Sequence, residues 1–465
     1  MLYAKARLIR IGTELGKDSR LRYLLNLVYA TLLTLLSPWL LYRAVFQKKN
    51  RRGWWIKLTG RVPSRKSVSP CIWLHAVSVG EVNLLRPIMS ELSNRFPGCE
   101  FAISTTTETG YDLARKLYPR DQVFFCPFDF TWAIRNVIRN IRPSLLVLAE
   151  LELWPNLISV SQGCGVPVAL VNGRISARSF ENYLRFKWFW SPVLRKVTAS
   201  GVQNEEYGRR MEALGVDPQA IQITGSVKFD GANTDRGNAQ TQQLRKLVGL
   251  QPDDFVFLAG STQVEEDLMA AEALLRLRES EREIRLVLVP RHIHRSQKLK
   301  KILTDRGLSV QLRSELGEQK NQDVFATADV LVVDVIGELS AWWGLASVAY
   351  VGGSMGKRGG QNMIEPAAYG VPVCFGPQTR NFRDVVQLLL DQHAAQVVCS
   401  ENDLGNFVQS AISQPQLAEQ MGLRGQQLVI RQRGAVDRTV VMLEEILNRK
   451  KSTDLQRDTK RHAAA

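Results

Sequence analysis

Short apolar runs without polar alternation constrain the fold of this chain more than any other feature of its sequence. A strand with one solvent-exposed face alternates apolar and polar residues, so uninterrupted apolar runs indicate strands that are buried on both faces. Helical patterns such as Glu265–Arg278 and His294–Arg306 lie between the runs. The first series of runs comprises Cys71–Val77, Phe101–Thr107, Val123–Phe128, Leu145–Ala149, Val166–Val171 and Ile221–Gly225, and the second comprises Phe255–Ala259, Ile284–Val289, Val330–Val335, Val348–Val351 and Val371–Phe375. The alternation predicts an α/β protein with parallel, doubly wound sheets.

The chain of 465 residues is too long for one ordinary hydrophobic core, and a polar stretch over Gly231–Gln243 separates the two series. We therefore expect two Rossmann-like domains that face each other across a cleft. The expected boundaries are residues 1–55 for an N-terminal membrane anchor with a basic flank, 56–240 for the first domain and 241–448 for the second. Residues 449–465 are charged and rich in small side chains, so we expect a disordered tail there.

An uncharged stretch over Leu24–Leu41 is close to the roughly 20 residues that cross a membrane. It predicts an N-terminal hydrophobic membrane helix. The cluster of basic residues that follows predicts that the large downstream part stays on the cytoplasmic side. Asn26 and Pro38 interrupt a clean span, so a helix that lies in the membrane surface remains the alternative.

The formal net charge is +16, but the lysines and arginines are scattered and do not form a strip with aromatic residues. This pattern argues against nucleic acid and favours an anionic membrane surface or anionic substrates. The 6 cysteines lie far apart without the paired spacing of a zinc site or a redox dithiol, which indicates reduced thiols in the cytosol. The 5 histidines likewise show no ligand spacing, so we expect no metal site.

The stretch Val351–Val373 has the order apolar strand, glycine loop, helix start and second strand. Glycines let backbone N–H groups approach anionic oxygens closely, and the following helix presents the positive end of its dipole. The stretch therefore predicts a site for a phosphorylated ligand, with the polar side chains of Asn362 and Glu365 beside it. The glycines of this expected phosphate cradle are Gly352, Gly353, Gly359 and Gly360. The alternative is that these glycines serve only the turns between strand and helix.

Charged residues follow several of the expected strands, at the sheet edge where ligands bind in α/β domains. Glu81 follows the first strand and is placed for acid–base chemistry, although it could instead complement a helix N-terminus. Glu150 and Glu152 follow another buried run, where they could act in catalysis or anchor a loop. Lys228 and Arg291 also end strands, where they could neutralise a phosphate or carboxylate or form ordinary surface pairs.

These motifs, in this order, resemble the 3-deoxy-D-manno-octulosonic acid (Kdo) transferase family of bacterial lipopolysaccharide assembly. The resemblance covers essentially the whole chain and includes the N-terminal hydrophobic segment. The motifs that carry it are His75-Ala-Val-Ser-Val-Gly-Glu81, Glu150-Leu-Glu-Leu-Trp-Pro-Asn156, Asn172-Gly-Arg-Ile-Ser-Ala-Arg178, Gln203-Asn-Glu-Glu206, Gly225-Ser-Val-Lys-Phe-Asp230, Pro290-Arg-His292, Ile336-Gly-Glu338 and Gly359-Gly-Gln-Asn-Met-Ile-Glu-Pro366.

The resemblance implies a GT-B glycosyltransferase that moves Kdo from CMP-Kdo to a lipid A precursor of the lipid IVA type, with inversion and without a cofactor or bound metal. Glu81 matches the position of the general base, and Glu150 and Lys228 match positions that stabilise the transition state. The implied location is the inner membrane, with the catalytic domains on the cytoplasmic side. The residues that match the CMP-binding segments are Pro290, Arg291, Ile336, Gly337, Glu338, Asn362, Met363, Ile364 and Glu365.

Two other functions are compatible with the predicted fold. A related GT-B enzyme could act on another nucleotide sugar, as a transferase or an epimerase, because a fold alone does not fix chemistry. A basic membrane-associated scaffold that binds nucleotides without turnover is the non-enzymatic alternative, but it leaves the joint presence of Glu81, Glu150 and Lys228 without a role. The sequence predicts neither the number of Kdo units transferred nor the oligomeric state.

Overall fold

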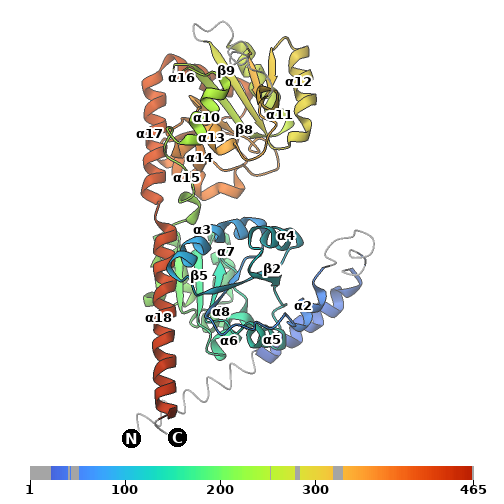
Figure 1. The fold of residues 1–465 in the computed structure, drawn as a ribbon, viewed down its shortest axis with the longest axis vertical. Helices are drawn as coiled ribbons and strands as arrows, with labels where there is room; N and C mark the ends of the chain where they lie inside the picture. Colours follow the sequence, from blue (N-terminus) through green and yellow to red (C-terminus); the bar gives the residue numbers. More distant parts are fainter. Residues whose placement is uncertain are drawn as a thin grey trace. The chain divides into compact units, whose positions relative to one another are not determined.

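The computed structural model describes residues 22–39, 42, 52–251, 253–277, 283–317 and 328–462, with the backbone alone for residues 453–462. The chain forms two compact units. Unit 1 comprises residues 1–230 and 434–465, and unit 2 comprises residues 231–433. Each unit is a parallel sheet flanked by helices, which is the α/β class that the sequence predicts (Figure 1).

Unit 1 is built on a seven-stranded parallel sheet with the strand order β3-β2-β1-β4-β5-β6-β7. Strands β1, β4 and β5 are buried along their whole length, as runs without polar alternation predict. The chain order reverses between β1 and β4, and the crevice at the carboxyl ends of two such strands is where open α/β sheets bind ligands. The strands are β1 (Cys71–His75), β2 (Glu100–Thr105), β3 (Gln122–Phe125), β4 (Leu145–Ala149), β5 (Val168–Gly173), β6 (Ala199–Val202) and β7 (Ile221–Ile223).

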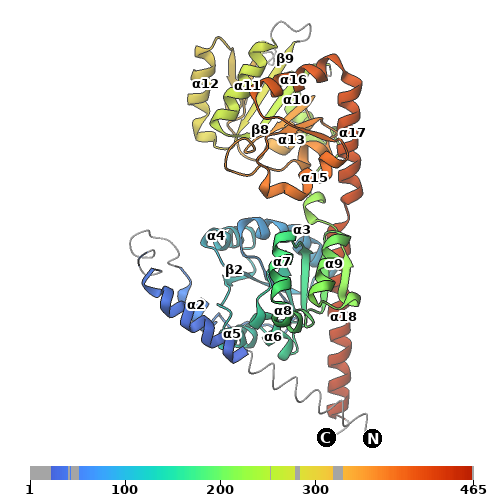
Figure 2. The ribbon, with the colours of Figure 1, turned by 180° about the vertical axis from the view of Figure 1, so that it is seen from behind.

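The helices of unit 1 bury their apolar faces in two hydrophobic clusters, one with each face of the sheet. Figure 2 shows α7, α8 and α9 on the side that faces away in Figure 1. The helices are α2 (Trp54–Thr59), α3 (Val79–Arg95), α4 (Glu108–Leu117), α5 (Thr131–Ile141), α6 (Pro155–Gly163), α7 (Ala177–Arg185), α8 (Lys187–Leu194), α9 (Glu205–Leu214) and α18 (Ala435–His462), with 3-10 turns η1 (Pro218–Ala220) and η2 (Val227–Phe229).

Unit 2 repeats this plan, with the strand order β10-β11-β9-β8-β12-β13-β14 and a reversal of chain order between β8 and β12. Its strands are β8 (Phe255–Thr262), β9 (Ile284–Pro290), β10 (Val310–Leu312), β11 (Val330–Val332), β12 (Val348–Val351), β13 (Val373–Phe375) and β14 (Ala395–Val397). Its helices are α10 (Ala239–Val248), α11 (Val264–Arg276), α12 (Ser296–Asp305), α13 (Leu339–Trp343), α14 (Ile364–Ala368), α15 (Arg383–Asp391), α16 (Glu401–Ser413) and α17 (Pro415–Gln432), with 3-10 turns η3 (Ile293–Arg295), η4 (Arg313–Gly317) and η6 (Arg380–Phe382).

Three strands, β6, β10 and β14, are absent from the sequence-based prediction. Strand β6 has the sequence Ala-Ser-Gly-Val, and β10 and β14 are three residues long with a glutamine in the middle. Such segments carry too few large apolar side chains to form a recognisable run. They become strands because a neighbouring strand offers them backbone hydrogen bonds.

The division into units differs from the predicted boundaries of 56–240 and 241–448. The chain passes into unit 2 after Asp230, and α18 belongs to unit 1. The Asp230 carboxylate accepts a hydrogen bond of 2.8 Å from the Gly434 N–H and another from the Val436 N–H. Apolar residues of α18, such as Val440 and Leu443, are fully buried in the cluster that contains α3. The helix runs to His462, where the sequence predicts a disordered tail from residue 449.

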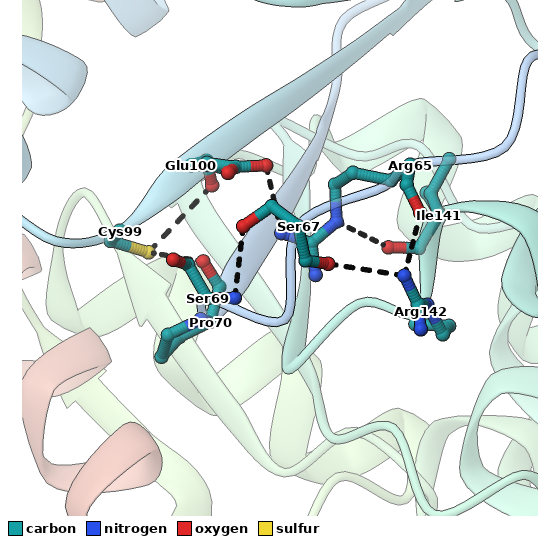
Figure 3. Close-up of polar contacts among 8 residues, drawn as sticks. All are labelled: Arg65, Ser67, Ser69, Pro70, Cys99, Glu100, Ile141 and Arg142. Carbon is teal, nitrogen blue, oxygen red and sulfur yellow. Dashed lines mark hydrogen bonds and ion pairs between the residues drawn. The ribbon is translucent and has the colours of Figure 1, made fainter.

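The segment before β1 is fixed at the amino end of the unit 1 sheet by a group of polar contacts (Figure 3). The Arg65 guanidinium donates to Glu100 Oε2 at 2.8 Å and to the Ile141 carbonyl at 3.0 Å. The Arg142 guanidinium donates to the Arg65 carbonyl at 2.6 Å and to the Ser67 carbonyl at 3.0 Å. Hydrogen bonds from Ser67 and Arg65 lower the pKa of Glu100. These contacts set where β1 begins.

The predicted membrane helix falls mostly within the described residues. Residues 22–39 are helical, whereas Leu40, Leu41 and the basic flank from residue 43 to 51 lie outside the described residues. Among the residues that the structure describes, no helix combines the length and the apolar character needed to cross a membrane.

Two glycines within helices of unit 2 give a matched test of its packing. A Cβ at Gly422 in α17 would lie 2.1 Å from the Gly370 carbonyl oxygen, whereas a Cβ at Gly405 in α16 would meet nothing within 4 Å. We expect Gly422→Ala to destabilise the protein by about 1–3 kcal/mol because the two backbones must separate. We expect Gly405→Ala to stabilise it by up to ~1 kcal/mol through helix propensity. Urea unfolding midpoints of the two variants that shift in the same direction would contradict this packing.

Candidate functional site

The carboxyl edge of the unit 1 sheet carries Glu81, in the first turn of α3. Its Oε2 accepts a hydrogen bond of 2.7 Å from the Val77 N–H, and its Oε1 accepts one of 3.0 Å from the Ser78 hydroxyl. Burial raises the pKa of Glu81 to about 7, with smaller rises from Glu152 and Glu150, while the hydrogen bonds from Val77 and Ser78 oppose the rise. The residue therefore satisfies the donors at a helix start and also has a pKa suited to proton transfer near neutral pH.

Glu150 and Glu152 follow β4, on the other side of the reversal in strand order from β1. Glu150 adopts the left-handed conformation with φ of 54°, a conformation that non-glycine residues seldom adopt outside special sites. Its carboxylate lies 3.7 Å from the Lys228 ammonium, so the structure brings together two of the residues that the sequence singled out. Burial raises the pKa of Glu152, and the negative charge of Glu150 adds to the rise. Three carboxylates thus gather at one sheet edge beside a lysine.

Lys228 is held at this edge by a buried asparagine that begins one of the family motifs but to which the sequence analysis gave no role. Asn172 is the next-to-last residue of β5 and adopts the left-handed conformation with φ of 55°. Its Oδ1 accepts a hydrogen bond of 3.1 Å from the Val227 N–H, at the start of the 3-10 turn η2 that contains Lys228. The turn is therefore fixed to the end of a central strand, which limits where the ammonium group can lie.

His75 ends β1 and is fully buried, with its Nδ1 2.9 Å from the Ser104 hydroxyl. Burial lowers the pKa of His75 to about 4, so the imidazole is neutral at cellular pH. Within the described part of the chain, no group of three or more His, Cys, Asp or Glu side chains is arranged to hold a metal ion. The metal-free mechanism stays a prediction.

The carboxyl edge of the unit 2 sheet is organised by Glu266, in the first turn of α11. The side chain is 1% exposed. Its carboxylate accepts hydrogen bonds from the backbone N–H groups of Gly353 at 2.7 Å, Ser354 at 2.9 Å and Met355 at 3.0 Å. It also accepts from the Gln263 N–H at 2.8 Å and from the Tyr350 hydroxyl at 3.0 Å. A carboxylate of the protein itself thus accepts the hydrogen bonds of the amides at the start of the glycine loop.

This arrangement corrects the expected phosphate cradle. The Gly353 N–H donates to Glu266, the Gly352 N–H donates to the Gly260 carbonyl at 2.9 Å, and the Gly360 N–H donates to the Gly353 carbonyl at 2.7 Å. These three amides have acceptors within the protein, so the prediction that they bind a phosphate is wrong. Their glycines serve the packing of the loop, which was the alternative.

The end of the glycine loop presents Asn362 and Glu365 as a connected pair. The Asn362 amide donates a hydrogen bond of 2.9 Å to Glu365 Oε1, and its Oδ1 accepts one of 3.1 Å from the Ile364 N–H. Burial raises the pKa of Glu365. The side chains of Met363 and Ile364 are buried in the core, with 0% and 1% exposure, so they hold the segment that carries the polar pair in place.

Glu338 is fixed by a cation from another loop of unit 2. The Arg313 guanidinium donates to Glu338 Oε2 at 3.0 Å and to Oε1 at 2.7 Å, a two-point pairing that sets both groups in one plane. Ile336 before it is 84% exposed, and Gly337 adopts a positive φ of 97°. The predicted Ile336-Gly-Glu338 segment is therefore an exposed turn that ends on a rigid ion pair.

Arg291 follows Pro290, the last residue of β9, and its side chain is exposed. Its N–H donates a hydrogen bond of 3.0 Å to the Thr262 carbonyl at the end of β8. The carbonyl of Thr262 also accepts a hydrogen bond of 2.7 Å from the guanidinium of Arg295, which pairs with the buried Asp267. The backbone of Arg291 is thus anchored while its guanidinium faces solvent.

Sequence reasoning missed Glu266, Asp267 and Arg313, and it named Asn172 within a motif without giving it a role. The acidic run at the start of α11 was visible as Glu265-Glu-Asp267 directly after a predicted strand, which is the signal that marked Glu81 and Glu150. Arg313 carries no such signal, because it lies far along the chain from Glu338 and meets it only in the fold.

The chain is similar in sequence to proteins of one family. A family model described as 3-deoxy-D-manno-octulosonic-acid transferase (kdotransferase) matches residues 49–231. The 3-deoxy-D-manno-octulosonic acid transferase of Chlamydophila psittaci is 31% identical over 361 residues, which cover 77% of this chain and 81% of that relative. The enzyme of the same name from Haemophilus influenzae is 29% identical over 381 residues, which cover 81% of this chain and 87% of the relative.

Solved structures support the fold. Acinetobacter baumannii MurG matches with a TM-score of 0.54 at 11% identity, over 81% of this chain and 99% of that one. A glycosyltransferase from Rickettsia africae matches with a TM-score of 0.51 at 12% identity, over 83% of this chain and 99% of that one. At these sequence identities the structural similarity is evidence for the fold alone. It confirms a GT-B-like pair of Rossmann-like units.

The role of Glu266 can be tested with its exposed neighbour as the control. Glu266→Gln keeps the size of the side chain but turns an NH2 group toward backbone donors, so we expect a loss of about 1–3 kcal/mol in stability. Glu265→Gln removes an exposed charge from the same helix turn and should change stability by less than about 0.5 kcal/mol. Thermal unfolding of the two variants measures the difference. Equal melting temperatures would show that Glu266 does not organise the loop.

Proposed function

The chain belongs to the Kdo transferase family of lipopolysaccharide biosynthesis, and we propose that it transfers Kdo from CMP-Kdo to a lipid A precursor of the lipid IVA type, with inversion. The observation that carries this proposal is the position of Glu81. A half-buried carboxyl group with a pKa near 7 lies at the carboxyl end of β1, beside the reversal in strand order where α/β sheets bind ligands.

Glu81 acts as the general base in the proposed reaction. Its carboxylate takes the proton from the acceptor hydroxyl while that oxygen forms a bond to the anomeric carbon of Kdo. The bond between the anomeric carbon and the phosphate oxygen breaks on the opposite side, and CMP leaves with the electron pair. A base with a pKa near 7 is well matched to this step, because it is substantially ionised at cellular pH and still accepts a proton.

Lys228 and Glu150 stabilise the transition state in the proposed mechanism. Negative charge grows on the departing phosphate, and Kdo itself carries a carboxylate, so an ammonium group nearby lowers the barrier. The Glu150 carboxylate at 3.7 Å and the turn anchored by Asn172 support Lys228 in one position. Pre-organised charge of this kind needs no rearrangement when the reaction occurs.

Unit 2 holds the nucleotide in this proposal. The exposed guanidinium of Arg291 suits the phosphate of CMP. The Asn362–Glu365 pair can donate and accept hydrogen bonds to the hydroxyl or base groups of a nucleoside. The exposed turn of Ile336 and Gly337, which ends on the fixed carboxylate of Glu338, can contact the same nucleotide. Pro290, Met363 and Ile364 contribute to this nucleotide site by holding the backbone of their segments in position.

We place the protein at the cytoplasmic side of the inner membrane. The acceptor in the proposal is a phosphorylated glycolipid, and the formal charge of +16 favours an anionic surface. The uncharged N-terminal stretch supplies an apolar contact with the bilayer.

A direct assay tests the reaction. Purified protein is incubated with lipid IVA and with CMP-Kdo that is generated in situ, and the glycolipid is weighed by mass spectrometry. We expect a mass increase equal to one or more Kdo residues, with turnover unaffected by EDTA because the proposed charges come from side chains. Transfer from another nucleotide sugar in place of CMP-Kdo would refute the proposed donor, and loss of turnover in EDTA would refute the metal-free mechanism.

The general base is tested by Glu81→Gln and by the pH dependence of kcat. The amide cannot accept the proton, so we expect at least a ~100-fold loss of kcat with unchanged affinity for CMP. In the wild type the active carboxylate is the deprotonated form, so kcat should rise about tenfold per pH unit below 7 and level off above it. The variant should lack this rise.

Glu91→Gln at the other end of α3 is the matched control, because Glu91 pairs with Arg95 on the same helix. It should retain wild-type kcat and the wild-type pH profile. If Glu81→Gln stays folded and keeps near wild-type turnover, the role of base passes to Glu150 or Glu152, and Glu81 only complements the helix start.

A further inference from the structure

The helix of residues 22–39 is bound to the rest of unit 1 through Asn26, which is 8% exposed. The Asn26 amide donates a hydrogen bond of 2.8 Å to the Thr131 hydroxyl, and its Oδ1 accepts one of 3.1 Å from the Thr131 N–H. The Asn156 amide donates a third, of 3.3 Å, to the same Oδ1. Thr131 begins α5 and Asn156 lies in the first turn of α6, so one side chain of the N-terminal helix joins two helix starts.

A second contact lies one turn further along the same face. The Tyr29 hydroxyl donates to Asp129 Oδ2 at 3.3 Å. Asp129 in turn accepts hydrogen bonds from the N–H groups of Asn156 at 2.9 Å and Leu157 at 2.8 Å, so it also belongs to the start of α6. The ring of Tyr29 meets Phe130 edge to face at 6.2 Å. Residues 26 and 29 are thus part of the folded unit, and the helix lies beside α5 in both ribbon views (Figures 1 and 2).

These contacts leave too little chain for a membrane span. From Tyr29 to Trp39 there are about ten residues, which extend roughly 15 Å in an α-helix. The uncharged stretch ends at Tyr42, and a helix continued to that residue would reach only about 20 Å. The hydrocarbon core of a bilayer is ~30 Å thick. A span would need Asn26 and Tyr29 to leave their partners. The Thr131 N–H would then lose its side-chain acceptor, and the Asn156 amide would keep only the Asp129 carbonyl.

The outward face of the same helix is apolar. Leu27 and Leu35 are 65% and 71% exposed, and residues 23–42 contain no charged side chain. The hydroxyl groups of Thr31 and Thr34 donate to backbone carbonyls one turn back, at 2.9 Å each, so they are satisfied within the helix. The remaining exposed large apolar or aromatic residues of the stretch are Tyr23, Leu24, Val28, Leu32, Leu36, Trp39 and Tyr42. This face is an extended apolar surface of the kind that enters a membrane interface.

Aromatic and cationic side chains continue from this helix onto unit 1. Phe130, which meets Tyr29, stacks at 4.4 Å on Trp132, and Trp132 is 46% exposed. The Trp132 indole donates a hydrogen bond of 3.0 Å to the Leu58 carbonyl in α2. In α2 the exposed Trp55 lies under the Arg61 guanidinium at 5.8 Å. Tryptophan beside arginine is the composition that suits the headgroup level of an anionic bilayer.

We propose that residues 22–39 form an in-plane helix, which is fixed to unit 1 through Asn26 and Tyr29 and lies with its leucines in the surface of an anionic bilayer without crossing it. This inference rests on the membrane location proposed above and decides between the two kinds of anchor that the sequence allowed. The occupant of the apolar face is the lipid bilayer. The catalytic unit is therefore held at a fixed orientation to the membrane by a rigid contact.

Protease access to an N-terminal epitope tag on the full-length protein tests the topology. An in-plane helix leaves both chain ends on the cytoplasmic side. The tag should therefore be digested in inverted inner-membrane vesicles and protected in intact spheroplasts. A tag that is protected in the inverted vesicles and digested in spheroplasts would show a span and overturn the proposal. The Kdo transfer assay in detergent reports the proposed function separately, because it does not depend on topology.

The two faces of the helix are tested with matched variants. Leu27→Gln with Leu35→Gln removes apolar area from the outer face, and vesicles of phosphatidylglycerol and phosphatidylethanolamine should bind this variant at least about tenfold more weakly. Thr31→Gln with Thr34→Gln, on the same exposed face, leaves the leucines in place and should bind like the wild type. Equal binding of the two double variants would overturn the outer-face assignment.

Asn26→Leu tests the inner face. The substitution removes three hydrogen bonds to α5 and α6 and should lower the melting temperature of the protein by several degrees, whereas the Leu27→Gln, Leu35→Gln variant should keep the wild-type value. Leucine at this position would instead favour insertion of a spanning helix, because it removes a polar side chain from the apolar stretch. An unchanged melting temperature in Asn26→Leu would therefore overturn the docking.

Discussion

The buried carboxylate of Glu266 organises the functional edge of unit 2. It accepts hydrogen bonds from three successive amides of the glycine loop, from the Gln263 N–H and from the Tyr350 hydroxyl. A buried carboxylate is stable only when donors replace the water that it has lost, and here the donors belong to the end of β12 and the start of α11. The loop therefore takes one conformation, and the position of Asn362 and Glu365 at its far end follows from it.

Unit 1 uses burial in a different way. Glu81, Glu150 and Glu152 lie at one edge of the sheet, where desolvation and mutual repulsion raise the pKa of Glu81 and of Glu152. Lys228 compensates part of this charge through its contact with Glu150. The two units thus differ in chemistry, because unit 1 holds groups that can exchange a proton and unit 2 holds fixed hydrogen-bonding groups, which the proposed function assigns to the nucleotide.

Long-range contacts fix the N-terminal helix and α18 within unit 1. In the sequence, Asn26 is a polar residue that interrupts an apolar helix. In the structure it forms hydrogen bonds with Thr131 and Asn156, which lie more than 100 residues away, and these bonds attach the helix. In the same way α18 packs on unit 1 after the chain has completed unit 2, since its apolar residues fill the cluster that contains α3. Sequence reasoning assigned the part of α18 up to residue 448 to the second domain and the rest to a disordered tail, because both follow that domain along the chain.

The sequence by itself determined the α/β class, most strands, the family and the carboxylates at strand ends, because burial on both faces removes polar alternation and parallel strands bring their carboxyl ends to one edge. It did not predict β6, β10 or β14, whose side chains carry no apolar run. Only the tertiary structure decided that the amides of Gly353 and its neighbours belong to Glu266, that Arg313 fixes Glu338, and that Asn26 is docked. These interactions join residues far apart in the chain, and a hydrogen bond between them exists only once the backbone has brought donor and acceptor within 3 Å or so of each other.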